Sequence, residues 1–354
     1  MNIGVIHGFV GGGGGTEKTL SGILEALEKT EHNVTLYTFS KPKSISKKIK
    51  IKSSLPISIP SFGLYQRAME SKLISKAKNE DILIQASGGL GIPKSKNQKI
   101  IVYCHSDFSN ELENPATKYK GVWSLYYKSY YNMVKKFVEN IQDSRIHLIS
   151  NSQYVHDSIQ RKFGKDSEIV YPPVDLREFS PGNKEDRVVT VGRFSEEKNL
   201  DFGIDVMSDV NYDYDIIGNT KTKSNLLYFK KLLKLKNNSK TQLLKDIDRK
   251  DLVDHLNRAK IYLHCSPETF GITVIESIAA GCIPIVPNNS AHVETVPFAE
   301  LRYTPNDILD AKTKLKNALD GKYDQLQKTI IKKINIYDKN YFKNSIIKYI
   351  ENLS

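Results

Sequence analysis

The sequence predicts an α/β protein with two doubly wound parallel-sheet domains. Apolar runs of strand length alternate with helical segments, which indicates parallel sheets. At 354 residues the chain is longer than a typical single hydrophobic core requires. The adjacent prolines Pro172 and Pro173 resist helix formation and divide the alternating series into two halves. We therefore expect a first domain over residues 1–170 and a second domain over residues 171–337.

The first half provides the strands of one complete sheet and the helices that connect them. Its buried strands are expected at residues 2–9, 33–39, 81–85, 99–103 and 146–150. Its helices are expected at residues 16–29, 64–78, 122–141 and 152–163. Because helices connect the successive strands, parallel pairing is favoured.

The second half repeats this arrangement. Its strands are expected at residues 187–191, 214–217, 242–244, 261–265 and 283–286, the last of which closes the series. Its helices are expected at residues 199–206, 252–258 and 273–280. A final helix over residues 341–353 has apolar side chains at helical spacing, and we expect the segment 338–354 to pack against the first domain.

Composition is typical of a globular protein in a reducing environment. The apolar content is 39%, and the chain lacks a run of about 18 apolar residues that would predict a membrane-spanning helix. The first residues lack the basic start and cleavage site of a secretory signal. Cys104, Cys265 and Cys282 match neither a disulfide framework nor a zinc spacing, so we expect buried thiols. A cytoplasmic location is the resulting expectation.

The net charge of +12 is concentrated in residues 1–170, which carry roughly +9. Much of the excess lies in a basic run over residues 41–52, from Lys41 to Lys52. Further lysines are interleaved with aromatic residues from Trp123 to Tyr131. Basic residues beside aromatic ones suit an anionic membrane surface. They also suit single-stranded nucleic acid, which we do not expect as a partner, and a plain solvated surface remains the alternative.

A glycine run and a pair of cations occupy strand-to-helix connections where anions bind. Residues 11–15 are all glycine, and Gly14 and Gly15 stand at the expected start of the first helix. Glycine there lets a phosphate approach the backbone N–H groups of a helix N-terminus. In the second half, Arg193 and Lys198 follow a strand, where they can neutralise a diphosphate or pair with neighbouring glutamates. The second strand does not end in an acidic residue, which argues against a dinucleotide-binding dehydrogenase.

The segment from Glu268 to Glu276 is the most informative stretch of the chain. It places two carboxylates eight positions apart around a Phe-Gly turn at a helix start. Carboxylates accept hydrogen bonds from hydroxyls, and the free N–H groups of a helix start bind phosphate. Phosphate and sugar hydroxyls are the two chemical faces of a nucleotide-sugar, so the segment points to sugar transfer.

Polar residues next to two further strands are secondary candidates. His105 follows the strand at 99–103, and Asp107 is close enough in sequence to compete for a role in the same site. Asp213 and Asp215 have the Asp-x-Asp form of some metal sites. They precede an apolar strand, so we interpret them as the start of that strand and expect no metal.

These motifs together resemble the family-four retaining glycosyltransferases of the GT-B fold, whose two domains are Rossmann-like. The resemblance runs over nearly the whole chain, in the family's order and spacing, through GGGGGTEK, YCHSDF, NSQYVHDSI, YPPVDLREF, VGRFSEEKN and SPETFGITVIESIAAGCIPI. The pieces GGGGGTEK, CHSDF, VYPPVD and FGITVIE are most similar to the lipid-linked oligosaccharide α-1,2-mannosyltransferases of N-glycan assembly.

The resemblance implies a nucleotide-sugar held in the cleft between the domains, mainly by the second one, without a metal or other cofactor. Arg193 and Lys198 match the family's diphosphate-binding cations. Glu268 matches the glutamate that contacts the donor sugar, and Glu276 matches the one that takes the ribose hydroxyls. His105 matches the histidine near the sugar.

The resemblance also implies a set of backbone contacts to the donor. Gly14 and Gly15 match the glycine loop beside the diphosphate. Four residues match the loop whose amides hold a sugar hydroxyl and a phosphate: Phe270, Gly271, Ile272 and Thr273.

The prediction is therefore an enzyme that moves a hexose, with mannose favoured, from GDP-mannose or a UDP-sugar to a glycan or lipid-linked glycan. The catalytic residues are expected to be His105, Glu268, Arg193 and Lys198, with fixed cations carrying the charge of the departing diphosphate. Peripheral attachment to the cytosolic face of a membrane would suit such an acceptor. The alternatives are a nucleotide-sugar epimerase on the same architecture and a non-enzymatic basic module that binds membrane or nucleic acid.

Overall fold

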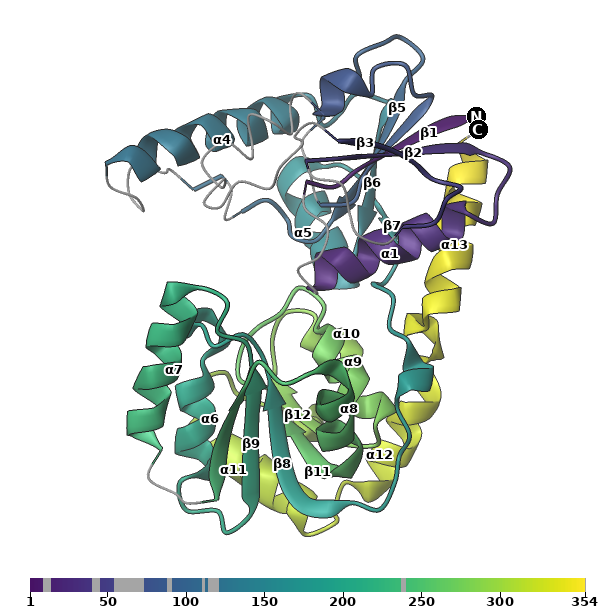
Figure 1. Ribbon diagram of the computed structural model, residues 1–354. Helices are drawn as coiled ribbons and strands as arrows, with labels where there is room; N and C mark the ends of the chain where they lie inside the picture. Colours follow the sequence, from purple (N-terminus) through teal and green to yellow (C-terminus); the bar gives the residue numbers. More distant parts are fainter. Residues whose placement is uncertain are drawn as a thin grey trace. The chain divides into compact units, whose positions relative to one another are not determined.

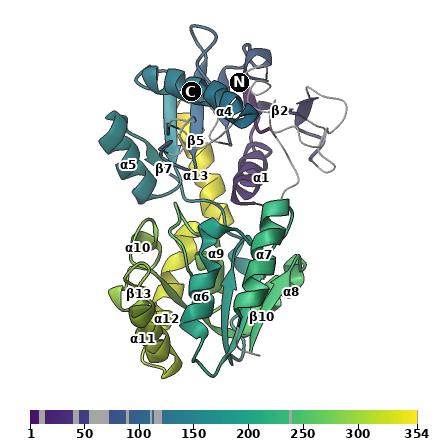
Figure 2. The same ribbon diagram turned by 90° about the vertical axis from the view of Figure 1, so that its left-hand side faces the viewer.

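The computed structural model contains two compact units, which are described separately. Unit 1 comprises Met1–Pro173 and Asn340–Ser354, and unit 2 comprises Val174–Lys339. Figure 1 and Figure 2 show their strands and helices from two directions. The structure describes residues 1–8, 14–39, 45–53, 73–87, 91–109, 112–113, 121–236 and 240–353.

A seven-stranded parallel sheet forms the centre of unit 1, in the order β3-β2-β1-β4-β5-β6-β7. The strands are β1 (Asn2–Ile6), β2 (Asn33–Thr38), β3 (Lys50–Ser53), β4 (Ile82–Gln85), β5 (Lys99–Cys104), β6 (Ile146–Ser150) and β7 (Glu168–Ile169). The hydrophobic pattern does not predict β3, because this strand lies inside the basic run. Exposed lysines on this edge strand, Lys50 and Lys52, are a common protection against edge-to-edge pairing.

Helices cover both faces of this sheet, because successive strand residues point to opposite sides. The helices are α1 (Gly15–Leu27), α4 (Val122–Glu139), α5 (Gln153–Phe163) and α13 (Lys339–Asn352). On β5, Ile101 and Tyr103 face the core that α1 and α13 complete. Ile100 and Val102 face the opposite core, which contains side chains of α4 and α5. Of the helix expected at 64–78, residues 64–72 lie outside the described part, and a helical turn is present beyond them.

The C-terminal helix α13 is part of the core of unit 1, as the sequence predicted. Phe342, Ile346 and Ile350 are at most 2% exposed and belong to the same cluster as the core residues of α1. The helices approach closely at Gly22, where an added Cβ would lie 2.7 Å from the Phe342 ring. The last residues of the chain therefore complete a hydrophobic core that the first residues begin.

Unit 2 contains a six-stranded parallel sheet in the order β10-β9-β8-β11-β12-β13. The strands are β8 (Glu185–Val191), β9 (Asp213–Gly218), β10 (Thr241–Lys245), β11 (Ala259–Leu263), β12 (Ile283–Pro287) and β13 (Arg302–Tyr303). The prediction that residues 283–286 close the series is wrong, because β13 pairs with β12 beyond it. Two residues are too few for a hydrophobic pattern to reveal a strand. Asp213 begins β9, so the Asp-x-Asp pair marks a strand start as expected.

Helices also cover both faces of the second sheet. They are α6 (Leu200–Met207), α7 (Lys223–Leu235), α8 (Arg249–Arg258), α9 (Ile272–Ala279), α10 (His292–Thr295), α11 (Ile308–Leu319) and α12 (Asp324–Ile330), with the 3-10 turns η1 (Leu176–Glu178), η2 (Glu196–Lys198), η3 (Ala299–Leu301) and η4 (Ile331–Tyr337). α6 packs between α7 and α11, and α8 packs beside α9 (Figure 1). Four of these helices were not predicted from the sequence: α7, α10, α11 and α12.

Each sheet reverses its strand order at one point, and such a point is where open α/β sheets bind ligands. The reversal lies between β1 and β4 in unit 1 and between β8 and β11 in unit 2. The loops that follow the carboxyl ends of these strands are therefore the first places to look for a site.

Two sequence expectations, one on the cysteines and one on membrane-spanning helices, can be compared with the described part of the chain. The three cysteines are buried free thiols, as predicted. Within the described residues, none of the helices is both long enough and apolar enough to cross a membrane.

Candidate functional site

The loops after β8 and β11 bring together two residues that are 70 positions apart in sequence. Lys198 ends η2, which follows β8, and Glu268 lies in the loop after β11. The Nζ atom of Lys198 lies 2.5 Å from Oε1 of Glu268. Both side chains are mostly shielded, with 19% and 24% of their surfaces exposed. The structure thus places a cation and a carboxylate in contact at the switch point of the second sheet.

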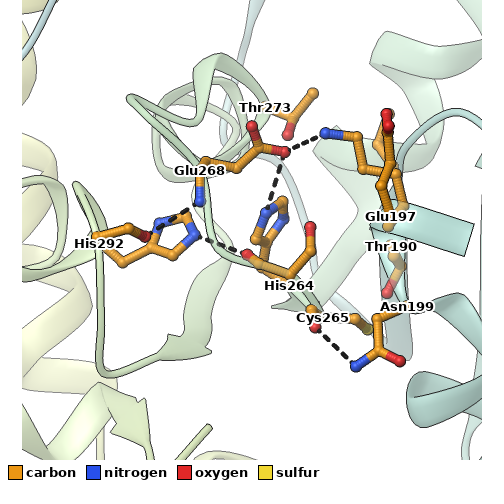
Figure 3. Close-up of polar contacts among 12 residues, drawn as sticks. Thr190, Glu197, Asn199, His264, Cys265, Glu268, Thr273 and His292 are labelled. Carbon is orange, nitrogen blue, oxygen red and sulfur yellow. Dashed lines mark hydrogen bonds and ion pairs between the residues drawn. The ribbon is translucent and has the colours of Figure 1, made fainter. Parts of the chain in front are cut away.

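Neighbouring backbone contacts hold each of these two residues in place. Asn199, directly after Lys198, has a left-handed backbone and donates a hydrogen bond from Nδ2 to the Cys265 carbonyl at 3.3 Å (Figure 3). The backbone N–H of Glu268 donates to Ser290 Oγ at 3.1 Å, and its carbonyl accepts from the N–H of Ala291. These contacts fix both loops against the strands that carry them.

His264, which was not predicted from the sequence, lies next to the carboxylate of Glu268. The Nε2 atom of His264 lies 3.7 Å from Glu268 Oε1, and its Nδ1 lies 3.1 Å from the hydroxyl of Tyr262. The ring of His292 packs edge-on against His264, with centroids 4.8 Å apart, and its Nε2 donates a hydrogen bond to the Ser266 carbonyl at 3.1 Å (Figure 3). The signal that could have revealed His264 is a polar residue at the carboxyl end of a buried strand.

The charges around Glu268 keep it ionised. Its burial acts to raise its pKa, but the neighbouring His264 and Lys198 outweigh burial and lower the pKa of Glu268 to about 2. Burial and the neighbouring His264 lower the pKa of His292 to about 3, so His292 is neutral at pH 7. The site therefore offers an ionised carboxylate beside a fixed ammonium group.

This arrangement predicts a pH-dependent contribution of Glu268 to stability. Its folded pKa of about 2 lies below the ordinary value of 4.5, so the stabilisation is complete above about pH 5 and is lost as the pH falls toward 2. We expect Glu268→Gln to lower the free energy of unfolding by on the order of 3 kcal/mol at pH 7 and by roughly half as much at pH 3. Urea unfolding at both pH values checks this, with the exposed Glu300→Gln as the control. If the difference in free energy of unfolding between wild type and Glu268→Gln is not smaller at pH 3 than at pH 7, the low pKa assigned to Glu268 is contradicted.

The start of α9 adds an anion-binding element beside Glu268. Gly271 caps the helix with a φ of +86°, a conformation that favours glycine, and an added Cβ would lie 3.2 Å from His292. The N–H groups of Ile272 and Thr273 open the helix and are the kind that bind phosphate. The Thr273 hydroxyl accepts a hydrogen bond from the Tyr262 hydroxyl at 2.8 Å.

Phe270 has a different role from its neighbours in this loop. Its side chain is 3% exposed and packs edge-to-face on Tyr337 of η4, with ring centroids 5.4 Å apart. The ring therefore anchors the loop in unit 2, and the residue would reach a ligand through its backbone.

Glu276 is buried in α9 and is held by an arginine that sequence reasoning also missed. Only 2% of the Glu276 side chain is exposed, and its Oε1 accepts from Nη2 of Arg249 at 2.8 Å. The Nε atom of Arg249 donates to Glu178 at 2.9 Å, and its guanidinium lies 5.4 Å from the ring centre of Phe179. A buried carboxylate with a fixed partner is prepared to accept hydrogen bonds from hydroxyl groups.

Arg193 is placed differently from Lys198. Its side chain is 59% exposed and pairs with Glu197, which is 57% exposed. This is the surface pairing that the sequence left open as an alternative. Exposed ion pairs are weak, so Arg193 can exchange Glu197 for a stronger anion such as a diphosphate.

Unit 1 carries the remaining candidates at its own switch point. Gly14 caps α1 and Gly15 begins it, and a Cβ added to Gly14 would meet no described atom within 4 Å. Residues 11–13 of the glycine run lie outside the described part. The helix start is therefore accessible to an anion on the side of Gly14.

His105 follows β5, and its Nε2 lies 2.9 Å from the Ala86 carbonyl at the end of β4. Burial lowers its pKa, so it is neutral at pH 7. His7, which sequence reasoning missed, is 4% exposed at the end of β1, and burial lowers its pKa to about 4. Asp107 is engaged elsewhere, because it accepts hydrogen bonds from Ser158 and Lys162.

The surface segments that the sequence proposed for membrane contact are described only in part. Lys47, Lys48, Lys50 and Lys52 of the basic run are exposed, whereas residues 41–44 lie outside the described part. The segment from Trp123 to Tyr131 forms the first half of α4. Most of its aromatic side chains lie outside the described part of the chain. Membrane contact through these segments remains a prediction.

Two family models match the chain and together reach from residue 13 to residue 335. Residues 13–178 match Glycosyltransferase Family 4, and residues 175–335 match Glycosyl transferases group 1. The chain belongs to the family-four glycosyltransferases of the GT-B fold, which are retaining enzymes that generally act without a metal ion.

A curated relative from Dictyostelium discoideum is named GDP-Man:Man(3)GlcNAc(2)-PP-Dol alpha-1,2-mannosyltransferase. It is 22% identical over 279 residues, which cover 70% of this chain and 54% of that protein. The chain thus spans about half the length of this relative.

Solved structures share the fold along the full chain at low identity. A sucrose-phosphate synthase from Thermosynechococcus elongatus aligns with a TM-score of 0.78 at 16% identity, covering 99% of this chain and 98% of that one. WaaG, a glycosyltransferase involved in lipopolysaccharide biosynthesis, aligns with a TM-score of 0.74 at 14% identity, covering 97% and 99%. Anabaena HepE in complex with UDP and glucose aligns with a TM-score of 0.71 at 14% identity, covering 99% of both chains.

Proposed function

We propose that the chain transfers a hexose from a nucleotide-diphosphate sugar to a glycan or lipid-linked glycan, with GDP-mannose as the favoured donor. The observation that carries this proposal is the contact between Lys198 and Glu268 beside the start of α9. A fixed cation and free N–H groups suit the diphosphate, and an adjacent ionised carboxylate suits sugar hydroxyls. The three elements lie at the switch point of one sheet.

The reaction would break the bond between the sugar and the diphosphate, which develops negative charge on the departing phosphate. Lys198 and the N–H groups of Ile272 and Thr273 would stabilise that charge, and Arg193 would join them by leaving Glu197. Both described contacts to Glu268 reach Oε1, so Oε2 would accept from a sugar hydroxyl. Glu276 would accept from the ribose hydroxyls. The roles of Gly14, Gly15 and His105 toward the donor remain predictions from the family resemblance.

The choice of mannose and of a lipid-linked acceptor has narrower support. It rests on the motifs shared with lipid-linked oligosaccharide mannosyltransferases and on the name of the Dictyostelium relative. The Anabaena structures contain UDP or UDP-glucose, which keeps a UDP-sugar as the second donor to test.

A thermal-shift panel of GDP, UDP and ADP, each with and without an attached sugar, tests the proposal. At 100 times Kd, a bound nucleotide should add about 2.7 kcal/mol and raise Tm by a few degrees. We expect GDP and GDP-mannose to give the largest shift, and Lys198→Ala to abolish most of it. The matched control Lys312→Ala removes a surface ion pair with Asp209 and should keep the shift. A panel without stabilisation contradicts the proposal and favours a non-enzymatic module.

Product analysis with the stabilising donor separates transfer from epimerisation. A transferase releases free nucleoside diphosphate as the sugar moves to an acceptor or to water. An epimerase leaves the sugar attached to the nucleotide and changes only its stereochemistry. Proton NMR of the reaction mixture distinguishes the two results.

A further inference from the structure

The outer face of α7 in unit 2 combines exposed leucines with lysines that have no acidic partner among the described residues. The inner face of this helix is buried in unit 2, where Tyr228, Phe229 and Leu232 are at most 7% exposed. On the outer face, Leu226, Leu227 and Leu233 are 36%, 59% and 42% exposed. Single exposed leucines are common on protein surfaces, but three on one short helix form a patch.

Three lysines lie among these leucines at helical spacing. Lys223 precedes Leu226 and Leu227 by three and four positions, and Lys230 and Lys234 continue the same stripe. We call the six residues the leucine–lysine face: Lys223, Leu226, Leu227, Lys230, Leu233 and Lys234. In Figure 2, α7 lies beside α6, which it contacts.

The charges of this face are not balanced within the described part of the protein. α7 does not contain an aspartate or a glutamate, and the described contacts include none for the three lysine ammonium groups of the face. Lys231, which belongs to a different side of the helix, shows the contrast, because it lies 3.4 Å from Asp201 and 3.8 Å from Glu196. Lys230 and Lys234 are like charges four positions apart, which repel each other unless an external anion screens them.

We propose that the leucine–lysine face docks on the surface of an anionic lipid bilayer, with α7 lying parallel to it. The leucines would enter the boundary between headgroups and acyl chains, and the lysine stems would lie along them with their ammonium groups at the phosphates. This site lies in the second unit, so it is separate from the basic run and the aromatic segment of the first. It does not depend on the transferase activity.

The residue types favour lipid over other anionic partners. Lysine is a compact point charge that tolerates a fluid array of headgroups, whereas arginine provides the forked contacts of defined carboxylate or phosphate partners, and α7 contains none. The face also lacks tryptophan, tyrosine and arginine, which dominate protein–protein hot spots. Leucine offers nucleic acid no aromatic stacking surface.

Vesicle co-sedimentation tests the proposal with the full chain. The vesicles are phosphatidylcholine alone and phosphatidylcholine mixed in equal parts with phosphatidylserine. Two double variants are compared with wild type: Leu227→Ser with Leu233→Ser, and Lys230→Gln with Lys234→Gln. The control applies the same chemistry to another exposed helix of unit 2, as Leu309→Ser with Lys316→Gln on α11.

We expect wild type and the control to bind the phosphatidylserine vesicles and not the neutral ones. Each α7 double variant should lower the partition coefficient roughly tenfold or more. For the lysine variant, this size follows because each lysine near the surface contributes about a fivefold factor. Equal Tm values and equal donor turnover in solution show that the variants are folded. The proposal is overturned if wild type does not bind, if it binds neutral vesicles equally, or if both α7 variants bind like wild type. Binding of wild type to RNA or acidic protein but not to vesicles overturns it as well.

Discussion

Replacing Lys198 with alanine is expected to lower kcat by two to three orders of magnitude. Lys198 is the shielded cation of the site, in contact with Glu268 at the carboxyl end of the second sheet. Loss of one preorganised donor that stabilises developing charge costs this much in other enzymes, and water cannot replace it in a shielded position. The variant also removes one of the two groups that keep the pKa of Glu268 low, so that pKa should rise.

Steady-state kinetics with the donor selected by the thermal-shift panel measures this effect. Lys312→Ala is the matched control, because it removes a lysine from a surface ion pair in the same unit. Lys198→Arg should recover part of the activity by restoring the charge with a different shape. A kcat for Lys198→Ala within threefold of wild type, in a variant with an unchanged far-UV spectrum, would falsify the role of this cation.

Replacing Glu276 with glutamine is expected to raise KM for the donor by roughly ten- to a hundredfold with little change in kcat. Its buried carboxylate is oriented by Arg249 and would accept from ribose hydroxyls that do not react. Contacts made equally in the ground state and the transition state appear in KM and not in kcat. The size follows from the loss of a charged hydrogen-bond acceptor, about 1.5–3 kcal/mol.

Two comparisons separate recognition of the ribose from a general disturbance of Arg249. Glu178→Gln removes the other acidic partner of the same arginine, but Glu178 is 42% exposed and should change KM only slightly. Binding of inorganic pyrophosphate, which lacks a ribose, should be the same in wild type and Glu276→Gln. Equal effects of the two substitutions on KM, or weaker pyrophosphate binding, would show that Glu276 acts on the fold of the site and not on the ribose.

Much of the architecture and part of the site could be predicted from the sequence. Lys198 and Glu268 each follow a buried apolar strand, and parallel sheets bring the carboxyl ends of their strands to one edge. The alternating pattern therefore predicts that they approach each other despite their separation in sequence. The apolar spacing of Phe342, Ile346 and Ile350 likewise predicted the inner face of the last helix.

Other features could not be read from the sequence, because they depend on side-chain direction and packing. Arg249 opens a polar helix, and only the fold shows that its guanidinium reaches the buried Glu276. His264 is one polar residue at a strand end, and its support of Glu268 depends on the turn that follows β11. The strands β3 and β13 are too short or too polar to produce a pattern.

The place of α13 has a consequence for how the chain matures during synthesis. Phe342, Ile346 and Ile350 fill the core of unit 1, so that core can close only after the segment that carries them has been synthesised. Unit 2 is contiguous, and its sheet can form earlier. Nascent chains that stop before residue 340 would leave an apolar groove open on the amino-terminal half, where chaperones bind and aggregation begins.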